Sequence, residues 1–190
     1  MKKNFIAALI LIAAVAGAYA FLRLTLPHRD LTPPGEGGIG MPAASLPQTR
    51  QMDLFFADLT GRRLSIERRE VTGENREDLL KNAVEELLKG PADETRIRTL
   101  PEAVVVRSVF TRERTIWVDL GGGVEDEHPG GAWTEVLAVY SIVNTLTENF
   151  TDISDVQILI NGRESETFAG HVDISTPLKS RIQLLAGEWE

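Results

Sequence analysis

Two stretches with helical periodicity, each lying between pairs of strand-like runs, constrain the fold of this sequence more than any other feature. The first begins after Asn75, a good N-cap, repeats apolar residues at i, i+4 and i+8, and ends at Gly90 and Pro91. The second, residues 132–150, is apolar around most of its circumference. Because a helix of that kind needs cover on most sides, we expect it to pack against most of a sheet.

The strand-like runs are short, rich in β-branched residues and bounded by turn residues. They predict strands at residues 52–58, 61–71, 103–110, 115–120, 156–160 and 164–170. Asn161 and Gly162, between the last two, form the residue pair that a two-residue hairpin turn prefers. The predicted order is ββαββαββ. Because hairpins pair their strands antiparallel, we expect an α+β fold in which two helices pack on one layer of mostly antiparallel sheet.

The N-terminus carries an uncharged apolar run, residues 5–22, which follows Lys2 and Lys3. As a helix this run is about 27 Å long, close to the thickness of a hydrocarbon core. We therefore expect residues 1–23 to form a signal anchor, whose transmembrane helix spans the membrane through residues 5–22 and leaves the lysines in the cytoplasm. The alternative is cleavage near Ala20, followed by secretion. Both interpretations place the domain outside the cytoplasm.

Composition divides the rest of the chain. Residues 24–49 are rich in Pro, Gly and small residues without a hydrophobic period, so we expect a flexible linker. Residues 50–182 hold the predicted strands and helices and form the expected domain, and residues 183–190 are a C-terminal tail. Beyond residue 50 the chain has 15 Lys/Arg and 26 Asp/Glu. Because a domain this acidic repels phosphate, we expect no nucleic-acid partner.

Several segments agree in order and spacing with a known family, among them "AVEELLKGP", "IVNTLTE", "VQILINGR" and "GHVDISTPL". With these segments, residues 51–179 resemble the GerMN domain, which is named after a spore-germination lipoprotein. The resemblance implies an exported, membrane-tethered module of the cell envelope, associated in spore formers with germination and the cortex, and without established catalytic residues. Two features differ from that lipoprotein: the chain has no cysteine for a lipobox, and it has a single copy of the domain.

His171 and Asp173 lie two residues apart, where they would share one face of a strand. A neutral imidazole beside a carboxylate can act as a general base. No nucleophile accompanies the pair, however, so we expect the two residues to close the fold. The acidic run "EDEHP", residues 125–129, lacks the spacing of an EF-hand and predicts a solvated loop.

Aromatic side chains are the other candidates for binding. Trp117, Trp133 and Tyr140 could together stack on sugar rings, although aromatic residues in strands and helices are more often in the core. Trp133, at the start of a predicted helix, is the best candidate for partial exposure. The predicted partner-binding residues are therefore Trp133, His171 and Asp173, and we expect no catalytic residue, cofactor or metal site.

These observations favour a non-enzymatic, membrane-anchored module that binds a cell-envelope protein or a peptidoglycan-associated partner. One alternative is an enzyme or regulator of cell-wall glycan or peptide hydrolysis, which would need two convergent carboxylates for glycan cleavage. Another is a self-assembling envelope scaffold, a homo-oligomer in which edge strands such as 52–57 or 164–169 pair between copies.

Overall fold

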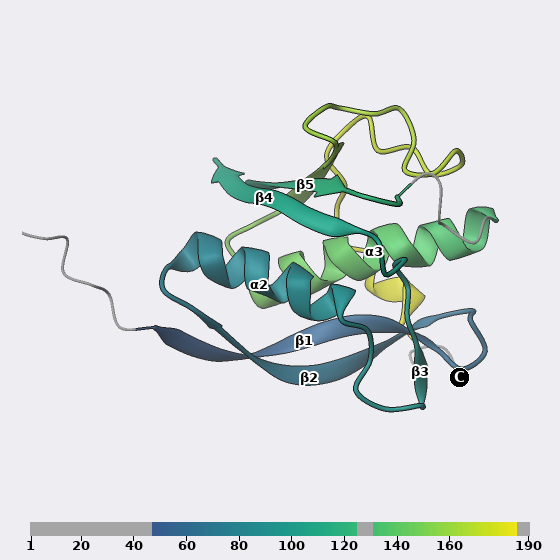
Figure 1. Cartoon of the computed structure of the whole chain (residues 1–190), viewed down its shortest axis with the longest axis horizontal. Helices are drawn as coiled ribbons and strands as arrows, with labels where there is room; N and C mark the ends of the chain where they lie inside the picture. The colour runs from purple at the N-terminus through teal and green to yellow at the C-terminus, as the bar shows by residue number, and fades with distance from the viewer. Residues whose placement is uncertain (1–46, 125–130, 186–190) are drawn as a thin grey trace, which may run out of the picture. The chain divides into compact units, whose positions relative to one another are not determined.

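The computed structural model describes residues 47–124 and 131–185. Along the chain its elements are β1 (Gln48–Asp58), β2 (Leu64–Gly73), α2 (Arg76–Leu88), β3 (Arg96–Ile97), β4 (Val105–Arg112), β5 (Thr115–Gly121), α3 (Ala132–Asn149), β6 (Asp155–Ile160) and a 3-10 turn, η1 (Ile182–Leu184) (Figure 1). The expected transmembrane helix and the acidic run 125–129 lie outside these residues, as does nearly all of the linker. Within them, no helix is both long and apolar enough to span a bilayer.

The α+β class with two helices is confirmed, but the strands form two sheets where one layer was expected. The sheets have the strand orders β2-β1-β3 and β4-β5-β6, and α2 and α3 lie between them (Figure 1). α2 contacts β2 and β4, and α3 contacts β1 and β6. The reason is the apolar circumference of α3, on which even Ser141, Asn144 and Thr145 are fully buried. A single layer of sheet leaves one side of such a helix in water.

The expectation of mostly antiparallel pairing holds for β1 with β2, β1 with β3, and β4 with β5. In contrast, β5 and β6 are parallel, with a register that runs from Thr115↔Asp155 to Leu120↔Ile160. The chain between these two strands contains α3, and a helical crossover returns the chain to the same end of a sheet. The two-residue strand β3 was not predicted because it is too short to show a period.

The last predicted hairpin is half correct. Asn161 and Gly162 form the expected turn with positive φ angles of 52° and 78°. The prediction of a strand at 164–170 is wrong, because this stretch has only the isolated bridge Thr167↔Asp173. The outer edge of β6 is taken by a later residue instead: Val156 and Leu178 exchange two backbone hydrogen bonds of 2.8 Å.

The second edge of β1 is paired with β3 at Ala57 and Asp58, and side chains of α3 cover it before that point. The backbone N–H of Asp53 donates to Asn149 Oδ1 at 2.9 Å, and Asn149 Nδ2 donates to the Asp53 carbonyl at 2.8 Å. The backbone N–H of Phe55 donates to Thr145 Oγ1 at 3.2 Å. The side-chain amide of Asn149 thus takes the place of a neighbouring strand. The expectation that residues 52–57 offer a free edge to another copy is therefore wrong.

Candidate functional site

Trp133 is the second residue of α3, and 47% of its surface is exposed. Its indole Nε1 donates a hydrogen bond of 3.1 Å to the carbonyl of Arg62, in the loop that joins β1 to β2. The exposed ring is therefore held in one place and does not swing freely in water. This placement agrees with the exposure expected from its position at the start of a helix.

The β1–β2 loop is organised by Asp58. Its Oδ1 accepts hydrogen bonds from Thr60 Oγ1 at 2.8 Å and from the backbone N–H of Arg62 at 3.2 Å. Burial alone would raise the pKa of Asp58, but the hydrogen bonds from Thr60, Arg62 and Arg63 outweigh it, so the pKa lies below its ordinary value. The ionised carboxylate fixes a tight loop that presents Leu59 to solvent with 64% of its surface exposed.

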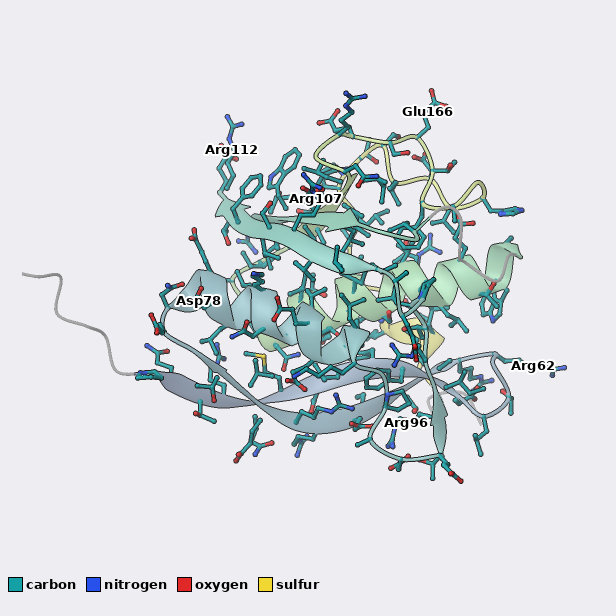
Figure 2. All side chains as sticks on the ribbon, viewed as in Figure 1. Arg62, Asp78, Arg96, Arg107, Arg112 and Glu166 are labelled. Carbon is teal, nitrogen blue, oxygen red and sulfur yellow. The ribbon has the colours of Figure 1, made fainter. Side chains whose placement is uncertain are left out.

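We call Leu59, Arg62, Arg63 and Trp133 the α3-end surface. Both arginines are exposed, and Figure 2 shows Arg62 projecting from the end of the β1–β2 loop. Tryptophan and arginine are enriched among the energetically dominant contacts of protein interfaces. This composition suits binding by contact.

Glu135, two positions after Trp133, was not predicted as important. Two positions turn a helix by about 200°, so the two side chains leave α3 on opposite sides. The Glu135 carboxylate is 1% exposed and accepts backbone hydrogen bonds from Ala169 at 2.9 Å, His171 at 3.1 Å and Val172 at 2.7 Å. It therefore fixes the turn at residues 169–172 to the start of α3.

The charge of Glu135 follows from these contacts. Burial would raise the pKa of its carboxyl group, but the backbone N–H groups of Ala169, Val172 and His171, with the His171 side chain, more than offset burial and lower the pKa. Sequence reasoning missed this role because an acidic residue in the first turn of a helix is common for a simpler reason, the helix dipole. The only available signal was one charge within an apolar stripe.

The side chains of His171 and Asp173 bind different partners. Nδ1 of His171 lies 3.0 Å from Glu135 Oε2, and 52% of the His171 side chain is exposed. The Asp173 carboxylate instead accepts hydrogen bonds from Ser175 Oγ at 2.6 Å and from the Ser175 backbone N–H at 2.9 Å. The Ser175 hydroxyl and N–H lower the pKa of Asp173. Both residues support turns, and His171 alone combines a buried partner with an exposed ring.

The three aromatic residues considered for sugar binding have different surroundings and do not form one stacking platform. Tyr140 is 5% exposed, and the Arg181 guanidinium lies 4.7 Å from its ring centroid. Trp117 stacks on Phe110, with ring centroids 6.0 Å apart and planes 5° from parallel. Only Trp133 belongs to the α3-end surface. In the described part of the chain, no three His, Asp or Glu side chains are placed to hold a metal ion.

A family model and several solved structures are similar to this chain. The model of the Germane domain, described as sporulation and spore germination, matches residues 53–166. The first GerMN domain of the sporulation protein GerM from Bacillus subtilis is similar with a TM-score of 0.54 and 21% identity, over 70% of this chain and 98% of that one. The tandem GerMN domains of the same protein give 0.53 and 20% over 70% of this chain and 46% of that one.

A candidate lipoprotein from Clostridium perfringens is also similar, with a TM-score of 0.51 and 22% identity over 69% of this chain and 87% of that one. A comparison with curated proteins gave no match. The structural likenesses support the fold, and the family match covers more than half of the sequence. The chain therefore belongs to the GerMN family of sporulation and spore germination domains.

Proposed function

We propose that this chain is a non-enzymatic module of the bacterial cell envelope, anchored through residues 5–22 with its domain outside the cytoplasm. It binds an envelope protein or a peptidoglycan-associated partner through the α3-end surface. The observation that carries the proposal is the exposure of Trp133, at 47%, and of Leu59, at 64%, in the loop to which the Trp133 indole is hydrogen-bonded. Two large apolar side chains held in water by an ordered loop gain free energy when a partner covers them.

The loop geometry supports binding at low entropic cost. Asp58 holds the β1–β2 loop through Thr60 and Arg62, and Trp133 is joined to that loop by its indole N–H. A surface that is already ordered loses little conformational freedom when it binds. Arg62 and Arg63 add donors for acidic or carbonyl groups of a partner.

The contacts of Glu135 disfavour a hydrolase centred on His171. A glycosidase needs a carboxylic acid with a raised pKa to protonate the leaving group. The pKa of Glu135 is lowered instead, and its oxygens are occupied by backbone N–H groups of residues 169–172. The scaffold alternative loses the two edges that suggested it, since residues 52–57 are covered and residues 164–169 form no strand.

Site-specific photo-crosslinking in the native membrane tests the proposal. A benzophenone amino acid replaces Leu59 in the full chain, and Ile97, which is 43% exposed on β3, serves as the matched control position. We expect an adduct with an envelope component from position 59, lost when Trp133→Ala is added, and none from position 97. Equal adducts from both positions, or an adduct that is indifferent to Trp133→Ala, would contradict a role for this surface.

Protease protection of intact cells tests the location. An antibody epitope placed after Glu190 should be removed by external protease once the outer layers are opened, whereas an epitope before Lys2 should be protected by the membrane. Loss of the N-terminal epitope during export would indicate cleavage near Ala20 and secretion. Protection of the C-terminal epitope would show that the domain stays inside and would overturn the proposal.

A further inference from the structure

We propose that β4 is a docking edge for an extended, acidic segment of another protein, which adds to the sheet β4-β5-β6 as a fourth strand. Strand addition combines backbone hydrogen bonds along an exposed edge with pockets for alternate side chains. The proposal concerns the opposite sheet from the β1–β2 loop, so it does not depend on the α3-end surface.

One edge of β4 is free. It is the terminal strand of its sheet, and within residues 47–124 and 131–185 its backbone is paired only with β5. β2, a terminal strand of the other sheet, has side-chain partners at two of its carbonyls. The Thr72 carbonyl accepts from Asn82 Nδ2 at 2.7 Å and the Ile66 carbonyl accepts from an Arg96 guanidinium at 2.9 Å. Because unpaired edges invite association, the open edge of β4 is a place for a partner.

A groove lies below this edge, between the end of α2 and the start of β4. Its volume is about 260 Å³, and it is lined by Glu85, Leu88, Lys89, Val104, Val105 and Val106. Figure 1 shows β4 running above α2 on the near side of β5. Val105 is 53% exposed. Side chains of an added strand alternate between the two faces of the sheet, so one that faces the helices near Val105 would reach this groove.

The opposite face of the sheet carries a pair of stacked aromatic rings. Phe110 is 40% exposed and lies directly across from Trp117, on which it stacks. Their neighbours in the register, Val109 and Val118, are buried on the side of the helices. The remaining side chains of an added strand would therefore pass along the ring of Phe110. One edge strand thus has an apolar contact on each face.

Positive charge at one end of β4 favours an acidic partner. Arg112 and Arg114 are exposed and flank Glu113 in the β4–β5 turn, and Figure 2 shows Arg112 projecting from the end of β4. Arg114 acts on the carboxylate of Asp152, whose pKa it helps to lower. Among the described residues Arg112 is in no ion pair, whereas Arg68 and Arg76 elsewhere are. In a domain with excess acidic residues, an unpaired guanidinium group beside an open edge complements a carboxylate.

A neutral wall glycan fits this face less well than a peptide. A sugar hydroxyl both donates and accepts, and two polar side chains of the outer face that could pair with it, Asp119 and Gln157, are already engaged. Asp119 accepts from Gly162 N–H at 2.7 Å and from Arg107 Nε at 3.0 Å, and Gln157 Nε2 donates to the Ile174 carbonyl at 2.8 Å. Arginine can only donate. The observations therefore favour acidic side chains on an extended backbone.

The test uses the full chain in detergent micelles and a fluorescent eight-residue peptide of alternating valine and glutamate. One control peptide has lysine for glutamate, and a second is N-methylated at alternate residues, which removes the donors that strand pairing needs. We expect the acidic peptide to bind and to slow amide exchange across residues 105–112. Both control peptides should bind at least about tenfold more weakly. No binding of the acidic peptide, or equal binding of the N-methylated peptide, overturns strand addition.

Variants of the chain locate the site. Val105→Glu and Arg112→Glu should each weaken the acidic peptide about tenfold or more, whereas the matched control Leu59→Glu should not change binding. Unchanged melting temperatures show that the exposed substitutions leave the fold intact. Binding that survives both variants, competition by peptidoglycan fragments, or a concentration-dependent dimer abolished by Val105→Glu would each overturn the acidic partner protein. Because Leu59→Glu alters the α3-end surface, its result separates this edge from the proposed envelope-binding site.

Discussion

Glu135 is the residue that fixes the turn at residues 169–172 to the start of α3. Its carboxylate is buried, yet it accepts hydrogen bonds from the backbone of Ala169, His171 and Val172 and faces His171 Nδ1. These N–H groups would otherwise need a strand partner that the chain does not supply. One side chain therefore takes the place of a strand partner for residues 169–172.

Replacing this carboxylate should destabilise the domain. In Glu135→Gln, an amide nitrogen that only donates faces backbone N–H groups that also donate, which leaves buried donors unpaired. We expect a loss of about 1–3 kcal/mol in the free energy of unfolding, measured by urea denaturation. The matched control is Glu164→Gln, an exposed residue of the same loop, which should change stability by less than about 0.5 kcal/mol. Equal effects of the two variants would contradict the role of Glu135.

The same contacts predict a pH dependence. The pKa of Glu135 in the folded chain lies below its ordinary value of 4.5, so the unfolded chain binds its proton first as the pH falls. A carboxyl group of this kind contributes stability that is complete above its ordinary pKa and is lost as the pH falls through the folded value. We expect urea midpoints to fall below about pH 4.5, and to fall less steeply in Glu135→Gln. Parallel pH profiles would contradict this assignment.

Some properties of single residues could be predicted from the sequence and others could not. The exposure of Trp133 was predictable because a position at the start of a helix is determined locally. The partner of His171 was not, because Glu135 lies 36 positions away and only the fold brings the two together. Proximity in sequence suggested Asp173 instead, whose carboxylate is bound to Ser175.

At the scale of elements, the contact between α3 and β1 controls a sheet edge. Asn149→Ala removes both hydrogen bonds to the backbone of Asp53. We expect a loss of about 1–2 kcal/mol in the free energy of unfolding and concentration-dependent association, because β1 is then unpaired near Asp53, before the point where β3 begins to pair with it. Sedimentation of the full chain in detergent measures association. Thr49→Ala, an exposed change on the same strand, should stay unassociated, and an unassociated Asn149→Ala would contradict this account.

The elements themselves were predictable to different degrees. α2 begins after Asn75, whose side chain accepts from the Asp78 N–H, and Gly90 follows its end with a φ of 85°. These cap signals are local, and both helices were predicted within two residues of their ends. The second sheet and the parallel pairing of β5 with β6 depend on contacts across α3, to which no short window of sequence has access.

At the scale of the whole molecule, α3 couples the two sheets. Ile142 is fully buried in this helix, and α3 contacts α2, β1 and β6. Ile142→Ala should lower the free energy of unfolding by about 2–5 kcal/mol. Because both sheets share the helix, amide exchange should accelerate equally in β1 and in β5. Acceleration in one sheet alone would show that the sheets unfold separately. Leu59→Ala, on the exposed loop, is the control and should change neither.

The length of β1 has a mechanical consequence. Its eleven residues span about 36 Å, so the point where the strand begins and the loop that contacts Trp133 lie at opposite ends of it. If the proposed membrane anchor and a partner held at that loop pull against each other, the force runs along the strand axis. The covalent backbone of β1 would then carry the load, and the hydrogen bonds from Gln48↔Gly73 to Ala57↔Leu64 would not be peeled apart one by one. This geometry suits a tether that must stay folded under tension.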